Sequence, residues 1–311
     1  MKPDVLLINP MLPAIDQALR DAYTVHNYYE QADKSGFIDE TGSRIRGVVT
    51  GGASGIDGAL MRRLPALEVI AVNGIGTDAV DLEQARARGI HVSTTPGVLT
   101  DDVADLALAL LLAACRGICQ SDRYVRDGKW GKSALPLARR FSGMRVGIVG
   151  MGRVGRAIAT RAAAFGCPIS YTDLRAIPDV PYTFIADLHA LARDSDALVL
   201  AASADDAEGI IDASVLNALG PQGYLINVAR GRLVNERDLA EALEAGRIAG
   251  AGLDVFADEP NVPSGLIDER VVLQPHRGSA TVQTRTDMGN IVLASLADAF
   301  AGRRPTTSVT T

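Results

Sequence analysis

The sequence predicts an α/β protein built on parallel sheets. The chain has 311 residues, which suggests about two domains, because single hydrophobic cores stop growing near ~250–300 residues. Short apolar runs alternate with longer helical patterns along the whole chain, which is typical of parallel α/β layering. A glycine-rich turn, Gly150–Gly155, directly follows one of these runs. Together these observations predict about two domains with parallel sheets, one of them a Rossmann-like dinucleotide domain.

The first third of the chain holds one series of alternating elements. Strands are predicted near Val5–Ile8, Gly47–Thr50, Val69–Val72 and Ile90–Val92. The stretches Gly58–Leu64 and Leu82–Arg88 between them can form helices. The turn-rich segment Ser93–Gly97 then predicts a hinge.

A second series follows that hinge. One long helix is expected from Asp101 to about Arg126, with two acids in its first turn, where they suit the helix dipole. A last helix is expected from about Thr281 to Ala301, where apolar residues recur at helical spacing. Strands are predicted near Arg145–Val149, Ile169–Thr172, Ala197–Ala201, Tyr224–Val228, Ala251–Val255 and Val271–Gln274.

Composition excludes several classes of protein. Lys and Arg number 31 against 37 Asp and Glu, for a net charge of −6, which argues against nucleic-acid and membrane-surface partners. The longest apolar run, Leu106–Cys115, is shorter than the ~20 residues of a membrane span. Three cysteines indicate a reduced compartment rather than a disulfide scaffold, so the expected location is cytoplasmic. No metal site is expected.

The glycine-rich turn predicts a dinucleotide site. Gly150 permits a tight turn, Gly152 lets the backbone approach a pyrophosphate, and Gly155 allows close packing of helix and strand. The helix that begins here offers backbone N–H groups to phosphates. Val154 lies in the same loop, and Arg153 can add a charged contact.

An aspartate predicts the choice of cofactor. Asp173 ends the strand that follows the turn, about 20 residues after the glycines, where a carboxylate accepts hydrogen bonds from the adenosine ribose hydroxyls of NAD. Arg175, two residues later, can turn toward a 2′-phosphate, so NADP stays possible. NAD is the favoured cofactor.

Charged side chains collect at the ends of the later strands. Arg230, Asp254 and His276 each follow an apolar run, and Glu259 lies shortly after Asp254. Arginine binds a carboxylate and polarises a carbonyl, while histidine beside a carboxylate can give up a proton. Beside a nicotinamide, this set suits hydride transfer to a 2-oxo acid.

Several ordered motifs resemble the D-isomer-specific 2-hydroxyacid dehydrogenase family. The resemblance spans most of residues 70–282, and within the family the glyoxylate/hydroxypyruvate reductase branch is the most similar. It implies two Rossmann-like domains with an active-site cleft between them. Residues 98–282 would form the dinucleotide-binding domain, and residues 1–97 with 283–311 the substrate-binding (catalytic) domain. The shared motifs are Asn73–Asp78, Gly150–Gly155, Asn227–Arg232, Leu253–Pro260 and Pro275–Thr281, and Thr100–Asp105 and Phe165–Tyr171 indicate the branch.

The resemblance implies a role for each matching residue. Arg230 would bind the substrate carboxylate and carbonyl, His276 would donate the proton, and Glu259 would keep that histidine charged. Asp254 would bond the nicotinamide carboxamide. The remaining roles concern packing and the substrate: Val103, Val228 and Ala229 would border the nicotinamide, and the backbone of Asn73, Gly74 and Ile75 would hold the substrate carboxylate, which Arg230 and His276 also contact.

The resemblance also leaves alternatives open. Glyoxylate and hydroxypyruvate are the first expected substrates, a sugar acid such as 2-ketogluconate is the runner-up, and a dinucleotide-sensing corepressor-like protein is a third reading. A homodimer is expected, in which Trp130 either enters the neighbouring subunit's pocket or packs in the interface. The segment 201–208 departs from the family pattern and places Glu208 near the adenosine, and Arg277 stands where a small residue is usual.

Overall fold

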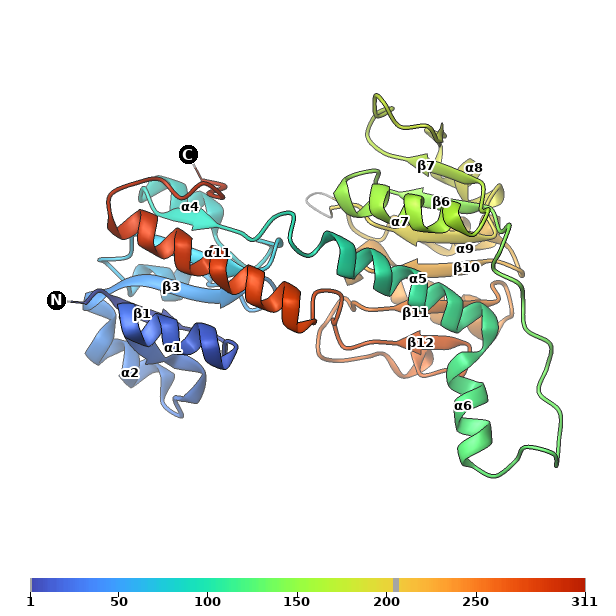
Figure 1. The fold of residues 1–311 in the computed structure, drawn as a ribbon, viewed down its shortest axis with the longest axis horizontal. Helices are drawn as coiled ribbons and strands as arrows, with labels where there is room; N and C mark the ends of the chain where they lie inside the picture. Colours follow the sequence, from blue (N-terminus) through green and yellow to red (C-terminus); the bar gives the residue numbers. More distant parts are fainter. Residues whose placement is uncertain (1, 204–206, 311) are drawn as a thin grey trace. The chain divides into compact units, whose positions relative to one another are not determined.

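The chain divides into two compact units. The computed structural model describes residues 2–203 and 207–310. Unit 1 consists of Met1–Leu99 with Ala280–Thr311, and unit 2 of Thr100–Ser279 (Figure 1). Residues 204–206, part of the divergent segment 201–208, lie outside the described residues. None of the helices in the described ranges is long and apolar enough to cross a membrane.

Unit 1 is a parallel five-stranded sheet in the order β2-β1-β3-β4-β5. This order is the flavodoxin-like form of the doubly wound fold, with a reversal of strand order between β1 and β3. The strands are β1 Asp4–Leu7, β2 Thr24–Asn27, β3 Ile45–Gly51, β4 Val69–Asn73 and β5 His91–Ser93. The helices are α1 Pro13–Ala22, α2 Lys34–Thr41, α3 Gly58–Arg62, α4 Leu82–Ala87 and α11 Val282–Phe300.

Alternating strand residues divide the core of unit 1 between the two faces of the sheet. Val5 and Leu7 pack with residues of α1 and α11, whereas Leu6 packs with residues of α2 and α3 on the other face. This alternation follows from the two-residue period of a strand, and burial on both faces explains why these strands are apolar throughout.

Unit 2 is a parallel seven-stranded sheet in the order β12-β11-β10-β9-β6-β7-β8. The six strands that come first along the chain, β6 to β11, follow the Rossmann order. This order reverses between β6 and β9. The strands are β6 Val146–Val149, β7 Ile169–Thr172, β8 Thr183–Phe184, β9 Ala197–Leu200, β10 Tyr224–Asn227, β11 Gly250–Leu253 and β12 Val271–Leu273. The helices are α5 Thr100–Arg116, α6 Ile118–Arg126, α7 Arg153–Ala164, α8 Leu188–Arg193, α9 Ala213–Leu219 and α10 Glu236–Glu244.

These sheets confirm the predicted α/β fold class, two Rossmann-like halves with parallel strands. Each predicted strand is present, and the sequence pattern missed β2 and the two-residue β8. The prediction of a single long helix from Asp101 to about Arg126 was wrong, because the structure has two helices there. Gly117 adopts a left-handed φ of 59° and divides it into α5 and α6, because glycine takes that conformation without a steric penalty.

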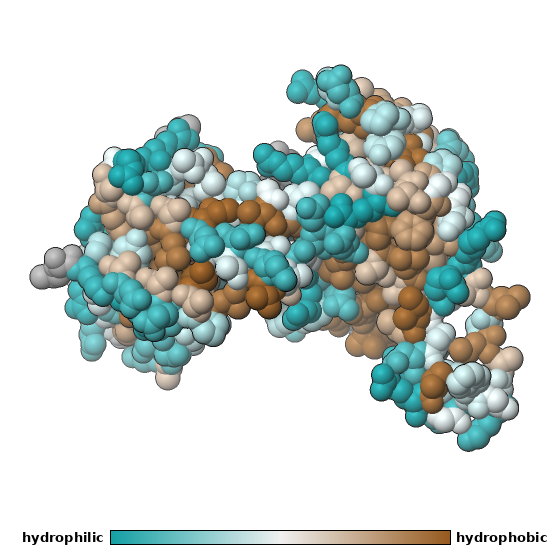
Figure 2. Space-filling view, in the orientation of Figure 1, coloured by the Kyte–Doolittle hydropathy of each residue, from teal (hydrophilic) through white to brown (hydrophobic). Residues whose placement is uncertain are grey.

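A segment that we call the arm, residues 118–144, consists of α6 and the long loop that returns to β6 (Figure 1). Several of its apolar side chains are exposed, including Trp130 and Leu137, whose exposed fractions are 79% and 102%. Figure 2 shows brown, hydrophobic atoms on this lobe among hydrophilic ones. Toward the carboxyl-terminal end of this loop, Arg139 pairs at 2.8 Å with Asp196, which directly precedes β9.

Candidate active site

Arg230 lies in a tight loop that follows β10. The Asn227 side chain, which is fully buried, shapes this loop by accepting a hydrogen bond from the Ala229 N–H at 3.0 Å. Its amide also donates to the Arg230 carbonyl at 2.9 Å. The Arg230 guanidinium donates to the Ala229 carbonyl at 2.8 Å. Asn227 is therefore a positioning residue that the sequence analysis did not single out.

A glycine brings this loop against the neighbouring one. A Cβ built on Gly231 would lie 1.9 Å from the Phe256 carbonyl carbon, so no other residue fits without moving the backbone. Gly231 thus fixes the Arg230 loop beside the loop after β11, which carries Glu259. The sequence contained this signal as the glycine directly after Arg230, but the spacing alone does not show what the glycine touches.

His276 and Glu259 form a hydrogen-bonded pair. The Nδ1 atom of His276 lies 2.8 Å from Oε2 of Glu259, and the other carboxylate oxygen accepts the Phe256 N–H at 3.1 Å. Burial raises the pKa of Glu259, but these hydrogen bonds outweigh it and hold the pKa below its usual value. Because Nδ1 faces the carboxylate, Nε2 is the ring nitrogen that can transfer a proton.

Asp254 holds the turn that carries His276. Its carboxylate accepts the N–H groups of Arg277 at 2.6 Å and of Gly278 at 2.8 Å, and its carbonyl accepts the His276 N–H at 2.8 Å. His276 itself has a positive φ of 52°, a conformation that non-glycine residues rarely adopt. Burial raises the pKa of Asp254, and the two backbone N–H groups oppose that rise.

An apolar side chain of α5 lies beside the same turn. A Cβ built on Gly278 would lie 3.2 Å from Cγ2 of Val103, which places this residue of α5 beside the His276 turn. Val228 and Ala229, at the end of β10, are each 8% exposed. The structure thus brings Val103 close to Asp254 and Gly278, and it places Val228 and Ala229 in the loop of Arg230.

The glycine loop after β6 fits a dinucleotide. Gly150 has a φ of 93°, and a Cβ on Gly155 would lie 2.0 Å from the Gly150 carbonyl oxygen. A Cβ on Gly152, in contrast, would meet no atom within 4 Å, so this backbone faces open space. The N-cap of α7 makes no side-chain hydrogen bond, which leaves the first N–H groups of Arg153 and Val154 for phosphates.

Asp173 lies at the end of β7, next to this loop. Its carboxylate accepts the Met151 N–H at 2.8 Å and the Leu174 N–H at 2.8 Å. Each oxygen keeps a second lone pair, so the carboxylate can hold the loop and still accept ribose hydroxyl groups. Arg175, two residues further, is exposed. These residues would hold a bound dinucleotide at the switch point of the sheet.

The predicted carboxylate cradle of unit 1 follows β4. Gly74 accepts the Thr95 N–H at 2.9 Å through its carbonyl, which anchors the loop. Ile75 has an exposed fraction of 43%, and Asn73 ends the strand. These three residues lie in unit 1, whereas Arg230, Glu259 and His276 lie in unit 2.

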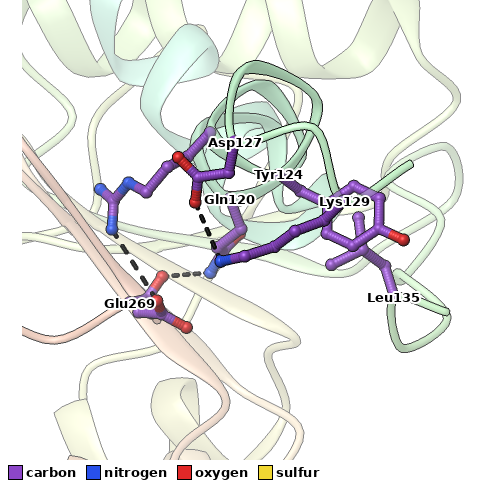
Figure 3. A pocket seen from close by; sticks show the side chains of 7 residues that line it. Gln120, Tyr124, Asp127, Lys129, Leu135 and Glu269 are labelled. Atoms are coloured by element: carbon purple, nitrogen blue, oxygen red, sulfur yellow. Dashed lines mark hydrogen bonds and ion pairs between the residues drawn. The ribbon is translucent and has the colours of Figure 1, made fainter. Parts of the chain in front are cut away.

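A hollow of about 140 Å³ lies against the arm and contains none of the predicted catalytic residues. Figure 3 shows its polar walls, in which Lys129 pairs with Asp127 at 2.9 Å. Arg123 lies 3.8 Å from a carboxylate oxygen of Glu269. Within the described part of the chain, no group of His, Cys, Asp and Glu side chains could hold a metal ion.

The carboxyl edge of the unit 2 sheet therefore joins a dinucleotide loop to an acid–base pair. This combination defines a nicotinamide-dependent oxidoreductase of the Rossmann class. Residues 108–278 match the family model of the D-isomer specific 2-hydroxyacid dehydrogenase, NAD binding domain. The chain belongs to the D-isomer-specific 2-hydroxyacid dehydrogenase family.

Relatives resemble the chain over its whole length. A 2-ketogluconate reductase of Gluconobacter oxydans (strain 621H) is 44% identical over 310 residues, covering 99% of each chain. A glyoxylate/hydroxypyruvate reductase A of Arabidopsis thaliana is 43% identical and covers 98% of each chain. The solved structure of an NADPH-dependent glyoxylate/hydroxypyruvate reductase from Sinorhizobium meliloti, in complex with NADP and malonate, has a TM-score of 0.89 and 36% identity, covering 99% of this chain and 97% of that one.

Proposed function

We propose that this protein is an NAD(P)H-dependent reductase that converts a small 2-oxo acid to the D-2-hydroxy acid. The observation that carries the proposal is the 2.8 Å contact between His276 and Glu259 at the sheet edge that binds the dinucleotide. A histidine whose Nδ1 is hydrogen-bonded to a carboxylate can donate a proton from its other ring nitrogen. Family membership agrees with this assignment.

Each of the three candidate catalytic residues has its own role in the proposed reaction. Arg230 binds the substrate carboxylate and polarises the carbonyl, because a guanidinium offers paired donors to oxygen atoms. His276 donates a proton from Nε2 to the carbonyl oxygen, and Glu259 stabilises the charged ring before that transfer. The reduced nicotinamide, when bound, supplies the hydride. Asp254 would bond its carboxamide, and the remaining contacts with the ring would come from Val103, Val228 and Ala229.

Unit 1 is proposed to be the substrate-binding part. The backbone of Asn73, Gly74 and Ile75 would hold the substrate carboxylate. Glyoxylate and hydroxypyruvate are the first proposed substrates, and a sugar acid of the 2-ketogluconate type is the alternative that the Gluconobacter relative supports.

Initial rates with purified protein test this function. The panel comprises glyoxylate, hydroxypyruvate, pyruvate, phenylpyruvate and 2-ketogluconate, each with NADH and with NADPH. Oxidation of the cofactor with at least one of these acids is expected, and its loss in His276→Asn should leave cofactor binding intact. Tight cofactor binding without turnover on any acid would contradict the reductase and favour a protein that senses the dinucleotide.

Asp173 is proposed to favour NAD over NADP. Its carboxylate would accept the ribose hydroxyls and repel a 2′-phosphate, although Arg175 can oppose that repulsion. In Asp173→Ser, the ratio of kcat/KM with NADPH to kcat/KM with NADH should rise about tenfold or more, because a like-charge contact is removed. An unchanged ratio would remove Asp173 from cofactor selection, and Asp179→Ser, an exposed acid in the same loop, is the control.

We also propose a homodimer formed through the arm. Exposed Trp130 and Leu137 would be covered by a second copy, because soluble proteins rarely leave large apolar side chains clustered at the surface. Whether Trp130 reaches the neighbouring substrate pocket or only packs in the interface, and the cytoplasmic location, stay predictions.

A further inference from the structure

The switch point of the unit 1 sheet carries polar side chains with no role assigned so far. Strand order reverses between β1 and β3, and in open α/β sheets ligands bind at the carboxyl ends of the strands beside such a reversal. Asn9 follows β1, and Ser54 lies in the loop after β3. Asn73, beside them, ends β4.

The orientation of the Asn9 amide is fixed by its neighbours. The Gly51 N–H donates to Oδ1 of Asn9 at 2.9 Å, so the NH₂ group must face the other way. That NH₂ group donates to the hydroxyl oxygen of Ser54 at 2.9 Å. Because the Ser54 oxygen accepts here, its own O–H can donate to a further oxygen atom. Both side chains are accessible from outside.

The loop that carries Ser54 is rigid. The Thr50 hydroxyl donates to the Gly55 carbonyl at 2.7 Å in a buried position. Gly55 has a φ of 54°, and a Cβ there would lie 1.9 Å from the Ala79 carbonyl oxygen. Ser54 is therefore held in place before any ligand arrives, which is what a recognition group needs.

Asn73 adds a hydrogen-bond acceptor to the same edge. Its Oδ1 atom is buried and has no hydrogen-bond partner among the described residues. A buried oxygen without a donor destabilises the folded protein, so such atoms are usually satisfied by a ligand or water. The loops after β3 and β4 touch, since a Cβ on Gly52 would lie 3.2 Å from the Gly76 carbonyl oxygen.

We propose that Ser54, oriented by Asn9, and the side-chain oxygen of Asn73 determine substrate specificity by binding hydroxyl groups on the carbon chain of the 2-oxo acid. A hydroxyl both donates and accepts, so it matches a serine O–H on one side and an amide oxygen on the other. The preferred substrates are then hydroxylated chains rather than aliphatic or aromatic ones. This inference rests on the proposed reductase function.

Pairs of substrates that differ by their hydroxyl groups test the proposal. We expect kcat/KM for hydroxypyruvate to exceed that for pyruvate, and kcat/KM for 2-ketogluconate to exceed that for 2-oxohexanoate. Ser54→Ala should lower the first ratio about five- to tenfold, the effect of one lost hydrogen bond, and leave glyoxylate nearly unchanged. Asn73→Ala should lower the same ratio. Ser35→Ala, an exposed serine of α2, should change neither.

The kcat/KM ratios distinguish failure of the hydroxyl-binding proposal from failure of the proposed reductase function. Each ratio compares two substrates on one preparation, so a partly unfolded variant does not alter it. Reduction of glyoxylate with equal ratios in wild type and Ser54→Ala would overturn the hydroxyl site and leave the reductase standing. Failure of the wild type on every 2-oxo acid would overturn both.

Discussion

Asp254 differs from most acids of unit 2 because only 2% of its surface is exposed. Its carboxylate accepts hydrogen bonds from two backbone N–H groups that directly follow His276. The acid therefore shapes the loop from which the candidate proton donor projects. Its effect on the reaction would come through the position of His276 as well as through the cofactor.

Asp254→Asn should lower kcat/KM about 10- to 100-fold, the range expected when a catalytic group shifts by a fraction of an ångström. The asparagine NH₂ group would face one of the two backbone N–H donors and push the turn open. Steady-state rates across pH measure this effect, since a displaced His276 loses its partner and changes the pH profile. Asp258→Asn, an exposed acid of the neighbouring loop, is the control, and a wild-type profile in Asp254→Asn would contradict the assignment.

Arg230→Ala should reduce turnover by a factor of about 100 to 1000, because one charged donor to the developing oxyanion is lost. Binding of NADH, followed by its fluorescence, should persist. Arg237→Ala removes an exposed arginine of α10 that pairs with Glu241 at 3.0 Å, and it should stay near wild type. Activity of Arg230→Ala within tenfold of wild type would exclude a catalytic role.

The candidate catalytic residues could be predicted from the sequence motifs, but the residues that position them could not. Arg230, Glu259 and His276 follow predicted strands, and parallel strands place such residues at one edge. Asn227 and Gly231 escaped notice because their roles depend on which loops touch. That contact is set by packing across the sheet and not by local spacing.

At the scale of elements, Asp196 fastens the arm to the amino-terminal end of the unit 2 sheet. It accepts hydrogen bonds from Arg139 at 2.8 Å and from the Arg145 side chain at 3.1 Å. Burial raises its pKa, but the arginines and the Arg145 N–H outweigh burial and lower the pKa from 3.8 to about 2. One carboxylate thus joins two segments that lie far apart in the sequence.

Asp196→Asn should destabilise the protein by about 2 kcal/mol at neutral pH, from the size of the pKa shift. A group whose pKa is lowered by folding stabilises the folded protein above its unfolded pKa. The wild type should therefore lose this contribution as the pH falls from about 4 to 2. Denaturant melts at several pH values measure it, with the exposed Asp122→Asn as control. Equal stability of Asp196→Asn and wild type at pH 7 would contradict the assignment.

The helix break at Gly117 shows where element prediction fails. The apolar pattern continues past Arg116, and a glycine inside a helix costs only about 1 kcal/mol relative to alanine. Local propensity therefore does not decide whether Gly117 continues or ends the helix. The left-handed turn at Gly117 redirects the chain into the arm, and the apolar pattern of the sequence does not show this change of direction.

At the scale of the whole molecule, the arm carries the exposed apolar side chains Trp130 and Leu137, on which the proposed dimer rests. Leu137→Glu should convert the proposed dimer to a monomer, because a charge in an apolar contact is costly. Sedimentation velocity measures the mass directly. Leu174→Glu, another fully exposed leucine outside the arm, should leave the mass unchanged. A monomeric wild type, or a dimeric Leu137→Glu, would contradict an interface centred on this residue.

Unit 1 is assembled from both ends of the sequence, and this has a consequence for synthesis on the ribosome. Its core needs Val292 and Leu296 of α11, and Thr310 closes the edge of β5 by accepting the Val92 N–H at 2.9 Å. Unit 2, in contrast, is one uninterrupted stretch. Residues 1–99 must therefore remain incomplete during synthesis, with an apolar sheet face uncovered, until unit 2 and α11 have been made. That interval is when the nascent chain most needs chaperones.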